Sequence, residues 1–224
     1  MKKRNIILFD IDYTLFNAKI YRELMFAVIA DTIALENRER LLQALEEVYF
    51  SHRKKTGGYF DIEFMLDELA RELAIEIDTV KVLEAILADE ASFQRSLFDE
   101  TVEVMEKLGG NKELHIGVFS SGREAHQLRK LQAFAHVFKQ EHMHIFLFKN
   151  NEIASVMKKY KNDNVYLVDD VLEILYKAKQ FHPHLVAIWM KRGRLADKQK
   201  PIENFTPDYT VEDLREIEPI LFIK

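Results

Sequence analysis

The stretch "IILFDIDYTLF", residues 6–16, decides how the rest of the chain is interpreted. Its uninterrupted apolar run, residues 6–9, predicts a strand that is buried on both faces. Asp10 follows this run directly, and Asp12 comes two residues later. Because a buried charge is costly unless it is paired, the two acids are either solvated turn residues or part of a site that holds a cation and carries out chemistry.

The composition is typical of a soluble globular protein. The chain has 224 residues, of which 48% are hydrophobic and 31% are charged, enough for one large domain or for a core with an inserted subdomain. The net charge of −5 argues against general binding to nucleic acid or to an anionic membrane surface. The absence of cysteine excludes disulfides, thiol nucleophiles and cysteine zinc sites.

Short apolar runs argue against targeting and membrane segments. The run after the basic start "MKKRN" meets Asp10 too early for the apolar region of a signal peptide, which needs about 7–15 residues. No run approaches the roughly 18–20 residues of a membrane helix. We therefore expect a cytoplasmic protein with no membrane partner and no nucleic-acid partner.

Residues 17–96 are predicted to be helical throughout. Apolar residues recur there at helical spacing, and a polar break with a Gly-Gly pair, "SHRKKTGGYFD" at residues 51–61, interrupts the pattern. The apolar faces comprise Leu41, Leu42, Leu45, Val48 and Tyr49; Ile62, Met65, Leu66, Leu69 and Leu73; and Val80, Leu83 and Leu87.

From about residue 99, predicted strands alternate with predicted helices. This order is typical of an α/β fold with a parallel sheet and right-handed crossovers. The C-terminal "PILFIK", residues 219–224, is apolar enough for an edge strand or an interface. We expect strands at 3–9, 114–120, 144–148, 165–170, 184–190 and 208–211, and helices at 99–108, 123–133, 151–160 and 171–180.

Polar groups follow the predicted strands at their carboxyl ends, where parallel sheets bind ligands. Besides the two acids at positions 10 and 12, they are Ser120, Ser121 and Gly122, then Lys149, then Asp169 and Asp170. Scattered loop polarity does not explain acids, hydroxyls, a lysine and an acidic pair at consecutive strand ends. The sequence therefore predicts one functional site at this edge of the sheet.

These residue types suit phosphoryl chemistry. Crowded carboxylates repel one another, and Mg²⁺ prefers such oxygen ligands, so Asp10 and Asp170 are candidate metal ligands. Lys149 would balance charge and hold an anionic group, and the Ser-Ser-Gly turn would hydrogen-bond a phosphate. A carboxylate beside the phosphoryl group can act as a nucleophile, and Asp12 could serve as general acid and base.

The order of these elements resembles the haloacid dehalogenase-like superfamily over essentially the whole chain. Its first motif, D-x-D-x-T, is matched by Asp10, Asp12 and Thr14. Its second motif, a hydroxyl residue ending an apolar strand, is matched by Ser120, and its third, a lysine, by Lys149. Its fourth motif, an acidic pair, is matched by Asp169 and Asp170 in "VYLVDD".

This resemblance implies a Rossmann-like three-layer α/β core with an inserted helical lid of the C1 cap type. Residues 1–16 and 97–224 would form the core, and residues 17–96 the cap. Asp10 would be the nucleophile and Asp12 the general acid/base. Mg²⁺ would be held by Asp10, the backbone carbonyl of Asp12, and Asp170, with Asp169 supporting the site.

Two further groups of residues are candidates for binding. The cap segment "HRKKTGG" contains Arg53 and Lys54, which could reach the substrate in a C1 cap, and a solvated run of charge explains them equally well. The histidines show no spacing typical of a metal site, and His142 and His144 share a face only if their segment is a strand. No histidine is assigned a function.

The sequence thus favours a magnesium-dependent phosphatase acting on a small phosphorylated metabolite, as a monomer or a homodimer. Alternatives on the same fold are a phosphomutase and a 2-haloacid dehalogenase, although the acid at position 12 favours phosphoryl chemistry. A non-catalytic sensor of phosphorylated metabolites is the alternative from another class. A signalling receiver domain ranks low because its acidic pair comes first in the chain.

Overall fold

The computed structural model describes residues 3–56, 60–193 and 196–221. The chain divides into two compact units. The core unit comprises Met1–Ala18 and Leu97–Lys224, and the helical unit comprises Lys19–Ser96. Among the described helices, none is long and apolar enough to cross a membrane.

The core unit is built on a parallel sheet of six strands, which confirms the α/β prediction. In spatial order the strands are β3 (Phe138–Phe146), β2 (Leu114–Ser121), β1 (Asn5–Phe9), β4 (Asn164–Asp169), β5 (Val186–Met190) and β6 (Tyr209–Val211). β1 lies at the centre, and its four apolar residues after Asn5 are completely buried. This burial on both faces explains why its sequence is continuously apolar rather than alternating.

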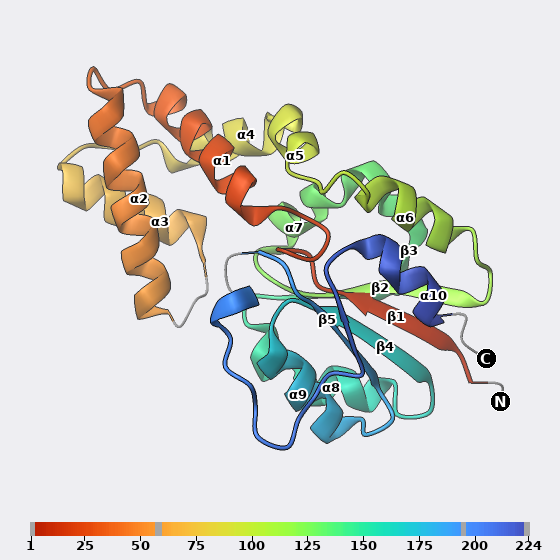
Figure 1. Cartoon of the computed structure of the whole chain (residues 1–224). Coiled ribbons are helices and arrows are strands. Elements are labelled where there is room, and N and C mark those ends of the chain that lie inside the picture. The colour runs from red at the N-terminus through yellow and green to blue at the C-terminus, as the bar shows by residue number, and fades with distance from the viewer. Residues whose placement is uncertain (1–2, 57–59, 194–195, 222–224) are drawn as a thin grey trace. The chain divides into compact units, whose positions relative to one another are not determined.

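Helices cover both faces of this sheet, as right-handed crossovers require. α8 (Ile153–Lys159) and α9 (Leu172–Phe181) lie on one side, and α6 (Thr101–Gly109) and α10 (Ile217–Leu221) lie on the other (Figure 1). α7 (Glu124–Lys130) follows β2. A continuous apolar core includes Leu8 and Leu167 from the strands and Met157 and Leu175 from the helices.

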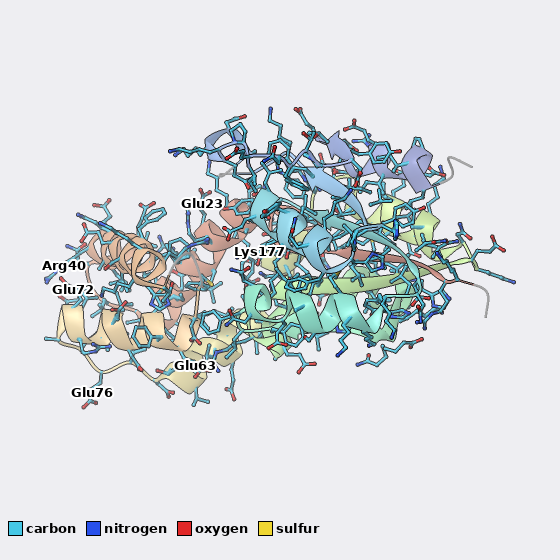
Figure 2. The ribbon with its side chains drawn as sticks, turned by 90° about the horizontal axis from the view of Figure 1, so that it is seen from below. Glu23, Arg40, Glu63, Glu72, Glu76 and Lys177 are labelled. Atoms are coloured by element: carbon cyan, nitrogen blue, oxygen red, sulfur yellow. The ribbon has the colours of Figure 1, made fainter. Side chains whose placement is uncertain are left out.

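The helical unit contains α1 (Ala18–Ile33), α2 (Arg38–Lys55), α3 (Ile62–Leu73), α4 (Thr79–Ala88) and α5 (Glu90–Arg95), as the sequence predicted. Asn37, Asp61, Asp78 and Asp89 cap the starts of α2 to α5 by accepting backbone N–H bonds. Each cap satisfies a helix N–H group that has no partner within the helix. Arg40 and Glu72 are exposed, and their side chains point outward in Figure 2.

One predicted strand lies partly elsewhere. β3 spans Phe138–Phe146 rather than residues 144–148, and most of its early residues are exposed. A polar edge strand carries little of the apolar pattern that identifies buried strands. Consequently Lys149 does not end a strand but begins a short 3₁₀ segment, η2 (Lys149–Asn151).

Two other segments also differ from the prediction. The predicted helix 123–133 divides into α7 and a 3₁₀ segment, η1 (Gln132–Val137). The described part of "PILFIK", residues 219–221, belongs to α10 and is therefore not an edge strand. Residues 222–224 lie outside the described chain. By contrast, the predicted last edge strand is confirmed as β6, beside β5.

The predicted polar break at residues 51–61 begins later than expected. α2 continues to Lys55, so Arg53 and Lys54 lie on its last turn rather than in a loop. Basic side chains near a helix C-terminus interact favourably with the helix dipole, which accounts for helix formation here. Gly57 and Gly58 of the same stretch lie outside the described residues.

Candidate active site

The sheet order brings the first and fourth acidic motifs together. β1 pairs with β4 so that Phe9 stands opposite Val168, and the backbone N–H of Asp10 donates to the carbonyl of Val168 at 2.9 Å. Asp10, which follows β1, and Asp169, the last residue of β4, are therefore neighbours. The site lies at the carboxyl ends of the strands, where doubly wound sheets bind ligands.

The acidic residues Asp10, Asp169 and Asp170 form a cluster, and each is at most 5% exposed. One carboxylate oxygen from each lies within 4.8 Å of the others. Hydrogen bonds with the backbone hold Asp169 and Asp170 as well. Asp169 accepts the N–H of Val171 at 2.9 Å, and the carbonyl of Asp170 accepts a bond from Trp189 at 3.1 Å.

Lys149 connects two of these carboxylates. Its Nζ lies 2.6 Å from Oδ1 of Asp10 and 2.7 Å from Oδ2 of Asp169. Burial alone would lower the pKa of this lysine, but the charges of Asp10 and Asp169 outweigh burial and raise it. Lys149 therefore remains charged and compensates for part of the negative charge in the cluster.

One lysine does not balance the whole cluster. Burial, with the charge of Asp10 added to it, raises the pKa of Asp169 to about 7 despite the opposing charge of Lys149. Burial and the charges of Asp10 and Asp169 raise the pKa of Asp170 well above its usual value. The site thus lacks enough positive charge to keep all three converging carboxyl groups ionised. This donor set fits Mg²⁺, a hard cation that prefers oxygen ligands.

Asp12 has a separate cationic partner. Lys130 Nζ lies 2.6 Å and 2.9 Å from its two carboxylate oxygens, and Gln127 donates to Oδ2 at 3.3 Å. Burial raises the pKa of Asp12, but the charge of Lys130 and the bonds from Lys130 and Gln127 outweigh it, so the pKa is lower than usual. The side chain is 33% exposed. Asp12 is thus ionised and accessible in the free site.

The end of β2 and the turn after it contain the remaining predicted residues. Ser120 is buried, and its Oγ accepts a bond from Gln127 at 3.2 Å. The Oγ of Ser121 accepts the backbone N–H of Lys149 at 3.2 Å, which links the turn to the lysine. Gly122 has φ of 138°, a conformation that L side chains rarely adopt. The turn therefore requires a glycine at this position.

The loop after Asp12 is held by tight backbone bonds. Tyr13 has φ of 64°, and its N–H donates to the carbonyl of Phe16 at 2.7 Å. The guanidinium of Arg192 donates to the carbonyl of Thr14 and to Oε1 of Glu100. These contacts fix the loop that carries Asp12.

Arg53 and Lys54, the predicted substrate-binding residues, belong to the helical unit. Arg53 donates to the hydroxyl of Tyr49 at 2.8 Å, and Lys54 is exposed. Their predicted contact with substrate stays a prediction.

Sequence reasoning missed Gln127 and Lys130. Both are on α7, which begins just after the Ser-Ser-Gly turn, and their spacing of three residues places them on one face. Both are buried, and a lysine is rarely buried unless it has a charged partner, which here is Asp12. Their spacing on the first helix after a functional turn could have indicated a role at the site.

No protein-family model and no curated protein matches the chain. Solved structures do. A haloacid dehalogenase-like hydrolase from Burkholderia xenovorans LB400 matches with a TM-score of 0.73 and 20% identity, covering 100% of each chain. A HAD-hydrolase from Bacillus subtilis bound to magnesium matches with a TM-score of 0.67 and 14% identity, covering 99% of this chain and 100% of its own.

A phosphatase from Clostridium difficile matches with a TM-score of 0.60 and 20% identity, covering 99% of this chain and 100% of its own. An L-2-haloacid dehalogenase also aligns with this chain. These similarities extend over nearly the whole chain at low identity, so they identify the architecture rather than the substrate. The chain has the haloacid dehalogenase-like hydrolase fold.

Proposed function

We propose that the protein is an enzyme of the haloacid dehalogenase-like type, a magnesium-dependent phosphatase that hydrolyses a small phosphorylated metabolite. The observation that carries this proposal is that the two acids of the first motif differ in their cationic partner and in their exposure. Asp10 is buried and bonded to Lys149, whereas Asp12 is partly exposed and bonded to Lys130. A nucleophile and an acid/base catalyst need such different environments.

Substrate phosphate would be bound by groups already directed into the site. The Ser120 hydroxyl and the ammonium of Lys149 are the donors that we expect, because the backbone N–H of Gly122 already donates to the carbonyl of Phe146 at 2.8 Å. Lys149 lies within bonding distance of Asp10, so it would place a phosphoryl oxygen beside the nucleophile. Bound Mg²⁺, held by Asp10, Asp170 and the carbonyl of Asp12 with Asp169 in support, would offset charge on the phosphoryl group.

The reaction would proceed in two displacements. An oxygen of Asp10 forms a bond to phosphorus as the ester P–O bond breaks, and Asp12 gives its proton to the leaving alkoxide. Asp12 then takes a proton from water, whose oxygen attacks phosphorus and releases phosphate from Asp10. The negative charge of an arriving phosphate would raise the pKa of Asp12 toward the value that an acid catalyst needs.

The helical unit would act as the cap of this enzyme. Its division from the core at residues 18 and 96 supports an inserted lid, with Arg53 and Lys54 as candidate substrate contacts. Closure of such a lid would exclude water from the reaction. The dehalogenase alternative uses an aspartate nucleophile without a second acid two residues later, so the environment of Asp12 favours the phosphatase.

Hydrolysis of a generic aryl phosphate tests the proposal directly. Wild-type protein should release phosphate with Mg²⁺ and not with a chelator. Asp10→Asn should abolish turnover, and Asp12→Asn should reduce it by about 10²–10⁴-fold. Circular dichroism would confirm that both variants are folded. Full activity of Asp10→Asn would overturn the mechanism, whereas halide release from a 2-haloacid would favour the dehalogenase.

If wild-type protein releases neither product, two further assays separate the remaining alternatives. Phosphate transfer between two positions of a phosphosugar would identify a mutase. Calorimetric binding of phosphorylated metabolites without turnover would identify a sensor.

A further inference from the structure

A cluster of histidines lies on β2 and β3, away from the catalytic strand ends. His115 is on β2, five residues before Ser120, which places it about 16 Å from that end of the sheet at about 3.3 Å per residue. His142 and His144 are on β3, and Tyr160 follows α8. His142 and Tyr160 are completely buried.

The rings are joined by a chain of hydrogen bonds. Nε2 of His142 lies 3.3 Å from Nδ1 of His115, and Nδ1 of His142 lies 2.9 Å from the hydroxyl of Tyr160. The same hydroxyl lies 2.6 Å from Nε2 of His144. If His142 donates from Nδ1 and Tyr160 donates to His144, Nε2 of His142 presents a lone pair toward His115. Such hydrogen bonds orient metal-binding histidines.

The backbone is shaped to bring these groups together. Between Ile116 and Val118 of β2, the pairing with β3 shifts from Phe138 to Met143. This irregularity lets the consecutive residues Glu141 and His142 both reach His115, which the alternation of a regular strand would prevent.

Gly117 makes room for the same arrangement. A Cβ at this position would lie 2.4 Å from the carbonyl oxygen of His142 and 2.5 Å from its Cβ. A side chain at position 117 would therefore displace His142.

We propose that His115, Glu141 and His142 form a second metal site, specific for a late first-row transition ion such as Zn²⁺. One ligand atom from each lies within 4.8 Å of the others. The separation of 3.3 Å between the two histidine nitrogens matches the edge of a zinc tetrahedron, about 3.3 Å for Zn–N bonds of about 2.05 Å. Glu141 Oε1, 4.0 Å from Nε2 of His142, is exposed and can rotate closer.

The donor set distinguishes this site from the carboxylate cluster. Imidazole nitrogens suit zinc, copper and nickel, whereas Mg²⁺ selects oxygen ligands. Nδ1 of His142 is bonded to the hydroxyl of Tyr160, so Nε2 is the nitrogen of this ring that faces His115 and can bind a metal. The ion would join β2 to the edge strand β3 across their irregular pairing.

Zinc titration of the full chain, with any polyhistidine tag removed and excess Mg²⁺ present, tests the proposal. A chromophoric zinc indicator should report one equivalent bound, and Zn²⁺ should raise Tm because it binds the folded state. His115→Ala and Glu141→Ala should each weaken binding at least tenfold. His184→Ala, which removes an exposed histidine elsewhere, and Asp10→Asn, at the carboxylate cluster, should bind as wild type.

Co²⁺ provides a second readout that does not depend on protein stability. Its visible absorption should have the intensity of a tetrahedral site in wild-type protein and lose it in His115→Ala. The proposal is overturned if wild-type protein binds no zinc, or if His115→Ala and Glu141→Ala bind zinc with unchanged affinity. It is also overturned if Asp10→Asn, rather than His115→Ala, loses the ion.

Discussion

Ion pairs join the neighbourhoods of β1 and β4 at both ends of these strands, and the pairs at the two ends differ in burial. At the amino end, Arg4 makes a two-point contact with Asp163, at 3.1 Å and 2.7 Å, and the arginine side chain is 45% exposed. At the carboxyl end, Lys149 joins Asp10 to Asp169, and these three side chains are at most 7% exposed.

The same kind of contact leaves the two acids with opposite net shifts in pKa. The hydrogen bond from Arg4 is the largest influence on Asp163, and it lowers the pKa of that carboxyl. Burial is the largest influence on Asp169, and it raises the pKa to about 7 although Lys149 is bonded to it. A nearby cation therefore stabilises a carboxylate at the surface but does not fully compensate for burial in a cluster of acids.

Removing Lys149 should have the largest effect. Lys149→Met leaves Asp10 and Asp169 buried without their cation, which should cost about 3–5 kcal/mol of unfolding free energy. Phosphatase activity should also be lost. Urea denaturation in metal-free buffer measures the first effect, and Lys158→Met, at an exposed position on α8, is the matched control. Equal stability of the two variants would show that Lys149 does not compensate for the cluster.

Removing Lys130 should act on catalysis more than on stability. Lys130→Met should lower kcat by about tenfold. This is less than the loss of about 10²–10⁴-fold expected when a general acid is removed, because Asp12 itself is still present. The limb of the pH–rate profile that reports Asp12 should move to higher pH, because Asp12 loses the charge that keeps its pKa low. Lys130→Arg should restore the profile. An unchanged pH profile in Lys130→Met would contradict the pairing of Asp12 with this lysine.

Neutralising Asp170 should separate stability from function. Asp170→Asn removes an acid whose pKa burial and neighbouring acids raise, so metal-free protein should gain about 1 kcal/mol of unfolding free energy. Magnesium-dependent activity should be lost, and Mg²⁺ should no longer raise Tm. Asp197→Asn, at a position that is 92% exposed, should change neither quantity. Lower stability of metal-free Asp170→Asn would show that the acid stabilises the fold.

Removing the surface pair should have the smallest effect. Arg4→Met should lower the unfolding free energy by less than about 1 kcal/mol near pH 7. The pKa of Asp163 is lowered by folding, so its contribution is present above the usual carboxyl pKa and is lost as pH falls through the lowered value. The difference between wild type and Arg4→Met should therefore shrink as pH falls below the usual carboxyl pKa and disappear once pH is below the lowered value. Urea denaturation across this pH range measures the difference in unfolding free energy. A difference that persists at low pH would argue against the ion pair as the cause of the lower stability of Arg4→Met.

The sequence by itself determined the class of fold and the position of the candidate site. The buried strand before Asp10, the alternation of strands and helices, and the polar residues after successive strands are local patterns. Such patterns report burial and backbone period, and these properties follow from each segment's own residues. The helical character of residues 17–96 was predictable for the same reason.

Only the tertiary structure decided which side chains share a partner. Strand order places Asp169 next to Asp10, and α7 directs Gln127 and Lys130 at Asp12, contacts that span more than 100 residues. The sequence pattern located only a part of β3. An exposed edge strand needs few apolar residues and therefore carries little of the pattern that identifies a strand. His115 and His142 meet because the pairing of β2 and β3 is irregular. Contacts between distant segments depend on the packing of whole elements, and a local sequence pattern does not encode that packing.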